Sequence, residues 1–210
     1  AMSGLREQLI ATARAMQPVG LNRGTSGNVS VRSGEGFYIT PTGLPYEALT
    51  TNDIPLMALD GSHHGTRTPS SEWRFHRDLY ASRPEVGAVL HAHSPFAVSL
   101  ACLRRAIPPF HYMIARFGGD TIRCADYAIF GSPELSTAAM LAMRERKGCL
   151  LANHGLLVAG HDLAEAFALA VELEELCEQY WRACQLGDPV LLSSTEMADV
   201  LKKFQSYGQQ

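Results

Sequence analysis

The sequence predicts an α/β fold in which helices flank a mixed or antiparallel sheet. Strand-like apolar runs and apolar positions at helical spacing are interspersed along the chain but do not alternate regularly. Hairpin-like strand pairs dominate the first half, which disfavours a doubly wound parallel sheet. The 210 residues contain no internal repeat, low-complexity tract or linker, so we expect one domain over residues 2–210.

The first half begins with one helix and continues as short strands. Apolar residues recur every three or four positions over 5–16, and Pro18 and Gly20 then end the helix. Alternating apolar residues after the glycine-rich turn at 23–28 predict strands, and Asp60-Gly61 closes the last of them. The expected strands are 29–32, 38–40 and 54–59. The first two should form a hairpin.

Five further helices are expected, and residues typical of helix starts introduce each one. Helical spacing begins at Glu72, with Ser70 or Ser71 in the N-cap position. Pro95 and Pro133 occupy first helical turns. Pairs three residues apart, Asp162 with Glu165 and Ser193 with Glu196, resemble capping boxes. The helices are expected from 72 to before Pro84, from 95, from 133 to about 147, from 162 to about 186 and from 193 to about 207–208.

The apolar strands of the second half run directly into polar residues. Residues 86–90 form a buried-type strand that continues into His91-Ala92-His93. Two apolar runs, 149–152 and 156–158, bracket Asn153-His154-Gly155. A fourth strand-like stretch, 110–115, follows two prolines. Histidines are therefore expected at the ends of apolar strands.

Composition excludes several functional classes. With 18 basic and 21 acidic residues the net charge is −3, so no overall basic field would hold nucleic acid or anionic lipid. No apolar run approaches the roughly 20 residues of a membrane span, and the start lacks a signal-peptide pattern, so we expect a cytoplasmic protein. The charged fraction of 19% is low, which indicates surface buried between copies of the chain.

Three histidines and one glutamate are candidate metal ligands. Alternate residues of a strand leave the same face, so His91 and His93 would present two imidazoles close enough for one zinc ion. His154 is a third candidate near a sheet edge, and Glu72 could bind the metal or act as a base. Each residue also has an ordinary alternative, a hydrogen bond at a strand end or a favourable charge at a helix start. Convergence of all four would decide between these interpretations.

Three turns could bind an oxyanion through backbone N–H groups and hydroxyls: 24–28, 40–43 and Ser70-Ser71. Taken singly, each is an ordinary turn or cap. The chain lacks the glycine-rich loops that bind nucleoside triphosphates and dinucleotides. Its three lysines lie near segment ends, which disfavours Schiff-base catalysis. If the chain stabilises a carbanion, a metal must do so.

Taken together, the motifs resemble the class II aldolase/adducin family. The resemblance extends from the first helix to the tail, in the same order and with similar gaps. The segments that carry it are 24–32, 39–47, 69–76, 91–93, 111–115, 154–155 and 203–208. It implies an α/β/α sandwich around a largely antiparallel central sheet, assembled as a homotetramer with one zinc ion per subunit near the interfaces.

The resemblance also implies roles for individual residues. His91, His93 and His154 would hold zinc, with Glu72 as a further ligand and as the acid/base. Tyr112 would exchange a proton with the substrate at the aldehyde end. The phosphate site would consist of Asn28, Thr42, Gly43, Ser70 and Ser71, and the aldehyde pocket of Phe130 and Tyr207.

The implied reaction is reversible cleavage of a ketose 1-phosphate to dihydroxyacetone phosphate and an aldehyde through a metal-stabilised enediolate. The substrate would be L-fuculose 1-phosphate or a related 5-deoxy or 5-methylthio pentulose 1-phosphate. Ribulose-phosphate 4-epimerase and methylthioribulose-phosphate dehydratase are alternatives on the same fold. An adducin-like interaction module is the alternative that is not an enzyme, although the presence of all three histidines and Glu72 weighs against it.

Overall fold

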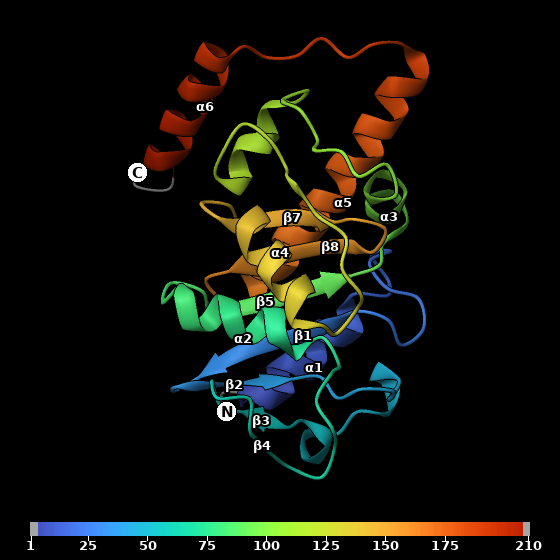
Figure 1. The fold of residues 1–210 in the computed structure, drawn as a ribbon, viewed down its shortest axis with the longest axis vertical. Coiled ribbons are helices and arrows are strands. Elements are labelled where there is room, and N and C mark those ends of the chain that lie inside the picture. The colour runs from blue at the N-terminus through green and yellow to red at the C-terminus, as the bar shows by residue number, and fades with distance from the viewer. Residues whose placement is uncertain (1–3, 208–210) are drawn as a thin grey trace.

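Eight strands form one sheet that crosses the whole protein, in the order β4-β3-β2-β1-β5-β8-β7-β6 (Figure 1). The computed structural model describes residues 4–207, so residues 2, 3 and 208–210 of the expected domain lie outside the description. All neighbouring strands are antiparallel except β6 and β7. The strands are β1 (Asn28–Ser33), β2 (Gly36–Ile39), β3 (Leu56–Met57), β4 (His63–His64), β5 (Ala88–Ala92), β6 (Cys124–Ala125), β7 (Gly148–Leu151) and β8 (Gly155–Gly160).

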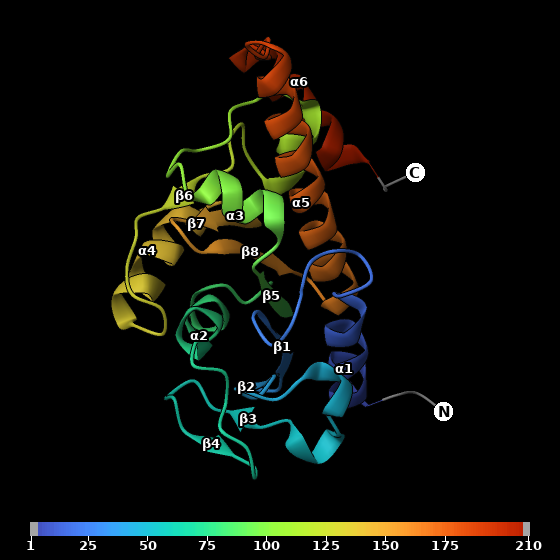
Figure 2. The same cartoon turned by 90° about the vertical axis from the view of Figure 1, so that its right-hand side faces the viewer.

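Helices cover both faces of the sheet (Figure 2). The α-helices are α1 (Leu5–Ala15), α2 (Trp73–Ser82), α3 (Pro95–Ala101), α4 (Pro133–Met143), α5 (Leu163–Leu186) and α6 (Ser194–Ser206). Helices α1, α3 and α5 contribute to the core on one face, and α2 and α4 to the core on the other. This arrangement confirms the expected α/β/α sandwich.

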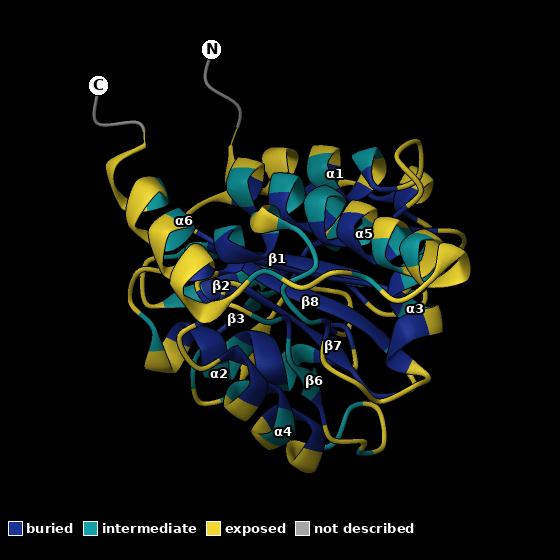
Figure 3. Ribbon diagram, turned by 90° about the horizontal axis from the view of Figure 1, so that it is seen from above, coloured by how far each residue is buried: buried dark blue, intermediate teal, exposed yellow. Residues whose placement is uncertain are grey.

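The period-two alternation of the strands explains why there are two cores. On β5, Ala88, Leu90 and Ala92 belong to the core with α5, whereas Val89 belongs to the core with α2. Figure 3 shows the strands buried between helices whose outer faces are exposed. The polar residue His91 follows Val89 on the α2 side and is fully buried, so that face requires polar partners for it.

The C-terminal helix α6 lies against the 3₁₀ helix η3 (Tyr112–Phe117), at the opposite end of the molecule from β4 (Figure 1). The predicted capping box at its start is present, because Ser193 and Glu196 each accept a backbone N–H from the other. Met197 is buried against the core. Helix α6 therefore brings the tail to the segment that carries Tyr112.

The expectation for 110–115 is wrong, because this stretch is not a strand. The side chain of His111 accepts a hydrogen bond from the backbone of Met113 and so starts η3, which ends at Gly118 in the left-handed region with φ of 100°. Tertiary context therefore overrides an apolar, β-favouring composition here. The remaining 3₁₀ helices are η1 (Tyr46–Ala48) and η2 (Thr51–Asp53).

Other boundaries differ from the prediction by small amounts. The third strand is only β3, and the two-residue strands β4 and β6 were not predicted because they are too short to show a period. Helix α4 ends at Met143 instead of near 147. Asp162 caps α5 as expected, because its side chain accepts a hydrogen bond from the Glu165 N–H. The Glu165 side chain accepts the N–H of His161 instead of that of Asp162, so the expected capping box is displaced by one residue.

The start of α2 matters for function. Neither serine is its N-cap; Glu72 takes that position without a side-chain cap, and Ser70 Oγ accepts the Glu72 N–H at 3.3 Å. The Glu72 carboxylate is therefore not used by its own helix. It is free to face the end of β5.

Candidate metal centre and substrate site

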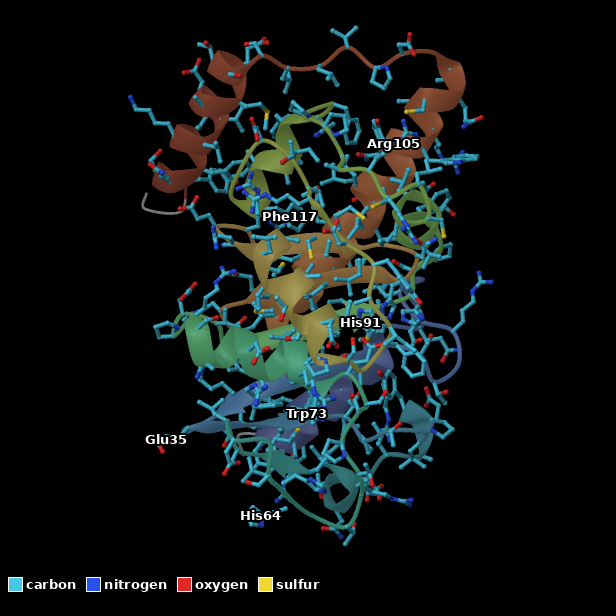
Figure 4. The ribbon with its side chains drawn as sticks, in the orientation of Figure 1. Glu35, His64, Trp73, His91, Arg105 and Phe117 are labelled. Carbon is cyan, nitrogen blue, oxygen red and sulfur yellow. The ribbon has the colours of Figure 1, made fainter. Side chains whose placement is uncertain are left out.

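The four candidate ligands lie close together, and this is the arrangement on which the interpretation as a metal site depends. Glu72, His91, His93 and His154 each offer one ligand atom, and these atoms lie within 4.8 Å of one another. Glu72 Oε1 lies 3.0 Å from His154 Nε2, and Glu72 Oε2 lies 3.5 Å from His91 Nε2. The Nε2 atoms of His91 and His93 are 3.0 Å apart. Figure 4 labels His91 near the middle of the molecule.

Backbone features bring these four residues together. His91 is on β5 and His93 lies just beyond its end, while His154 occupies the turn from β7 to β8, after Asn153 in the left-handed region with φ of 54°. A Cβ on Gly155 would lie 2.3 Å from the backbone oxygen of Ala92. Only glycine therefore lets β8 approach β5 closely enough to place His154 beside His93.

His91 is oriented and protonated as a metal ligand requires. Its Nδ1 lies 2.8 Å from the backbone oxygen of Leu156, which can only accept, so Nδ1 carries the proton and Nε2 faces the cluster without one. Burial lowers the pKa of His91 to about 3 and also lowers the pKa of His93, so both are neutral near pH 7.

Glu72 supplies a charged oxygen to the same space. Burial alone raises the pKa of its carboxyl. Attraction to His91, a hydrogen bond from His154, and attraction to His154 and His93, which act once these rings are protonated in acid, outweigh burial and lower the pKa to about 2. Glu72 Oε2 is buried and has no hydrogen-bond partner among residues 4–207. A buried carboxylate oxygen without a partner is costly unless a cation compensates it.

This donor set fits a divalent transition metal. Neutral imidazole nitrogens and a carboxylate are the ligands that zinc takes in catalytic sites. Two nitrogens bound tetrahedrally at zinc distances lie about 3.3 Å apart, close to the His91–His93 separation of 3.0 Å. His93 is exposed, so the cluster is accessible from outside.

No helix in the described part of the chain has the length and apolarity to cross a bilayer.

The three turns expected to bind an oxyanion also lie together beside this cluster. Asn28 is the register partner of His91 across β1 and β5. The backbone of Thr40 bonds to Val29, next to Asn28, and its carbonyl accepts the Ser70 N–H at 3.0 Å. A Cβ on Gly27 would lie 2.8 Å from His91 O, so the first turn packs directly on the strand that carries His91.

The expected phosphate residues differ in exposure. Asn28 and Ser70 are buried, whereas Thr42, Gly43 and Ser71 are exposed. Thr42 and Ser71 line a cavity of about 530 Å³ that also includes Phe130 and Arg74. The cavity therefore extends from the oxyanion-binding turns to one of the two expected aldehyde-pocket residues.

The remaining expected site residues are not gathered within one chain. Tyr112 is 52% exposed, and its ring stacks on His111; among residues 4–207 it makes no hydrogen bond or ring contact with the four ligands. Tyr112 lines a second cavity of about 750 Å³ together with Tyr207 and Phe204 of the tail. Phe130 does not line that cavity, so the two expected aldehyde-pocket residues lie in different hollows.

One polar residue beside the site is not among the candidate residues named from the sequence. His76 is fully buried and hydrogen-bonded to Asn28 and Ser30. A signal for this was present, because Asn28 and Ser30 share one face of a strand, while His76 and Tyr80 share one face of a helix. Polar residues in register on facing buried surfaces indicate a hydrogen-bond network.

Comparison with known proteins agrees with this geometry. Residues 7–181 match the family described as Class II Aldolase and Adducin N-terminal domain. A 5-methylthioribulose-1-phosphate/5-deoxyribulose-1-phosphate aldolase from Rhodospirillum rubrum is 54% identical over 204 residues, covering 97% of this chain and 92% of that protein. L-fuculose phosphate aldolase from Escherichia coli strain K12 is 47% identical over 205 residues, covering 97% and 95%.

Solved structures share the whole architecture. An L-fuculose 1-phosphate aldolase superposes with a TM-score of 0.93 at 38% identity, covering 98% of each chain. The L-fuculose-1-phosphate aldolase of Thermus thermophilus superposes with a TM-score of 0.75 at 28% identity, covering 89% of this chain and 98% of that one. With its sheet, its ligand cluster and its family match in agreement, this chain belongs to the class II aldolase and adducin family.

Proposed function

We propose that this protein is a zinc-dependent aldolase that reversibly cleaves a ketose 1-phosphate to dihydroxyacetone phosphate and an aldehyde. The observation that carries the proposal is the convergence of Glu72, His91, His93 and His154, with an unpartnered carboxylate oxygen at its centre. The oxyanion-binding turns lie beside this cluster. Residues 2–210 act as one domain in this proposal.

His91, His93 and His154 hold the metal ion, one per subunit, and Glu72 is the further ligand in the free enzyme. A divalent ion held there would supply positive charge that stabilises the negative charge on the substrate oxygens during carbon–carbon cleavage. We expect the phosphate to bind to Asn28, Thr42, Gly43, Ser70 and Ser71, which is supported by the cavity that Thr42 and Ser71 line and by the position of Asn28 opposite His91. These groups hold it through hydrogen bonds without a lysine.

Two side chains move protons. Tyr112 would accept the proton of the hydroxyl on carbon 4 as its own phenolic proton passes to water; the carbon 4 oxygen becomes the aldehyde carbonyl, and the bond between carbons 3 and 4 breaks and leaves its electron pair on the carbon 3 side. Glu72, after taking up a proton from water, would give it to carbon 3, which completes dihydroxyacetone phosphate. In the reverse direction Glu72, ionised near pH 7 because its pKa is lowered to about 2, removes that proton from carbon 3.

A homotetramer completes the site in this proposal. Tyr112 and Tyr207 are 52% and 80% exposed and share a cavity apart from the metal cluster, which supports their contribution to the site of a neighbouring copy. Phe130, 66% exposed, forms the part of the aldehyde pocket that belongs to the chain holding the metal. The enzyme works in the cytoplasm.

The proposed substrates are L-fuculose 1-phosphate, 5-deoxyribulose 1-phosphate and 5-methylthioribulose 1-phosphate, after the names of the two relatives. A cleavage assay over these compounds and ribulose 5-phosphate, with dihydroxyacetone phosphate as the readout, tests the proposal. Release of dihydroxyacetone phosphate supports an aldolase. Epimerised pentulose or a dehydrated product without carbon–carbon cleavage would instead identify the epimerase or dehydratase.

Two variants test the proton-transfer roles. Glu72→Gln should abolish proton exchange on dihydroxyacetone phosphate, because the amide cannot accept the carbon-bound proton. Tyr112→Phe should slow cleavage far more than it slows this exchange, because Tyr112 acts at the aldehyde end. Equal losses in both reactions would reject the role of Tyr112, and normal exchange in Glu72→Gln would reject that of Glu72.

A further inference from the structure

A buried chain of hydrogen bonds leads from the candidate phosphate site into the layer between the sheet and α2. Asn28 Oδ1 lies 2.5 Å from His76 Nε2, His76 Nδ1 lies 2.6 Å from Ser30 Oγ, and Ser30 Oγ lies 2.7 Å from the hydroxyl of Tyr80. Asn28 is 4% exposed, Tyr80 2%, and the other two 0%. Water therefore has little access to this chain.

Hydrogen-bonding capacity determines the direction of every proton in the chain. Asn28 Oδ1 can only accept, so His76 Nε2 must carry a proton. Complete burial lowers the pKa of His76 to about 3, so the ring is neutral and its Nδ1 has no proton. Ser30 therefore donates to Nδ1, and Tyr80 donates to Ser30.

This order leaves the amide nitrogen of Asn28 facing the site. Its Nδ2 group donates to no residue within 4–207, and Nδ2 is not one of the fully enclosed atoms without a partner. It therefore borders open space. Asn28 is also opposite His91 across the strands, so this space adjoins the metal cluster.

We propose that His76 is a positioning residue, which holds the Asn28 amide with its NH₂ group directed at the anionic end of the substrate. This inference rests on the proposed function, in which that end is the phosphate of a ketose 1-phosphate. If the amide flipped, its NH₂ group would meet the His76 N–H, and its oxygen would face the phosphate. Both contacts are unfavourable, one between two donors and the other between an acceptor and an anion.

The test compares three variants for affinity toward inorganic phosphate, measured by calorimetry on the zinc-loaded protein. His76→Leu removes the donor, and its phosphate affinity should fall about 10-fold or more, as expected for a hydrogen bond to a charged group. His76→Gln keeps an amide N–H near the position of Nε2 and should restore affinity to within about threefold. Zinc content should be unchanged in both.

Ser136→Ala is the matched control. Ser136 is 1% exposed and donates to Asp78 at 2.5 Å between α4 and α2, so this variant also loses a partly buried hydrogen bond on the same side of the sheet. Its phosphate affinity should equal that of the wild type. If the control loses affinity as much as His76→Leu does, the effect is general destabilisation and the inference is wrong.

The separate effects of His76→Leu on KM and kcat, and the tautomer of the His76 ring, give two further readouts. With an active substrate, His76→Leu should raise KM with a smaller change in kcat, because phosphate binding is used in both ground and transition states. In the unmodified protein, long-range proton–nitrogen NMR should show His76 protonated at Nε2 and not at Nδ1. The opposite tautomer would overturn the inference even if His76→Leu failed to fold.

Failure of this inference and failure of the proposed function are distinguishable. Unchanged phosphate affinity and unchanged KM in a folded His76→Leu variant would overturn the positioning role while aldolase activity persists. If no ketose 1-phosphate is cleaved but phosphate still binds and requires the His76 donor, the proposed reaction is wrong and the positioning of Asn28 is supported.

Discussion

Gly155→Ala should loosen the metal centre, although it changes none of the four ligands. The added Cβ would lie 2.3 Å from the backbone oxygen of Ala92 and 3.1 Å from a ring carbon of His93. Ordinary contact begins near 3.4 Å, so β5 and β8 must separate by about 1 Å at this point. The His91–Leu156 bond of 2.8 Å would then exceed hydrogen-bonding distance.

The structure sets the size of the effect. Overpacking a close backbone contact costs about 1–3 kcal/mol, and the lost hydrogen bond adds about 1 kcal/mol. The free energy of unfolding should therefore fall by about 2–4 kcal/mol. Because the change also disturbs the bond that orients His91, zinc affinity should decrease about 10- to 100-fold.

The free energy of unfolding is measured by urea unfolding with a chelator present, monitored by circular dichroism. The zinc affinity is measured by competition with a chromogenic chelator. Gly4→Ala is the control, because Gly4 has φ of −67° and no atom lies within 4 Å of its Cβ position. A Gly155→Ala protein within about 0.5 kcal/mol of wild type and with unchanged zinc affinity would refute the close-approach argument.

Three further predictions follow from individual contacts. His154→Ala should lose the bound metal, measured as zinc per chain after dialysis; retention of one zinc per chain would exclude His154 as a ligand. Burial lowers the pKa of His76 from 6.5 to about 3, so between these values the unfolded chain binds a proton that the folded chain does not, and stability falls as the pH falls. His76→Gln should reduce this slope by up to about 1.4 kcal/mol per pH unit in urea unfolding from about pH 6.5 to 4, and an unchanged slope would contradict the assignment. Ser193→Ala removes the α6 capping box and should cost that helix about 0.5–2 kcal/mol, seen as faster amide exchange in α6 alone; uniform exchange changes would contradict a local effect.

Much of the secondary structure was predictable because its signals are local. The helix over 162–186 and the strands ending at His91 and beginning after His154 follow from spacing, caps and apolar runs. The strand expected at 110–115 failed because an apolar stretch has the same composition in an extended chain and in η3. The distinguishing contact is one hydrogen bond from Met113 to His111.

The buried polar chain shows a different limit. Its residues are visible in the sequence, but Ser30 and His76 become partners only because α2 packs over β1. Taken alone, a histidine among apolar residues of an amphipathic helix gives no indication of its partner. The hydrogen-bond partners of His76 therefore depend on tertiary packing and not on its own helix.

By itself the sequence determined the ligand types and the local geometry of His91 and His93, because the two-residue period of a strand acts over neighbours in the chain. Only the tertiary structure decided that Glu72 and His154 join them, and that Tyr112 does not do so within one chain. The physical reason is that such distances depend on strand order and on close backbone approach at Gly155, both of which arise between segments far apart in sequence.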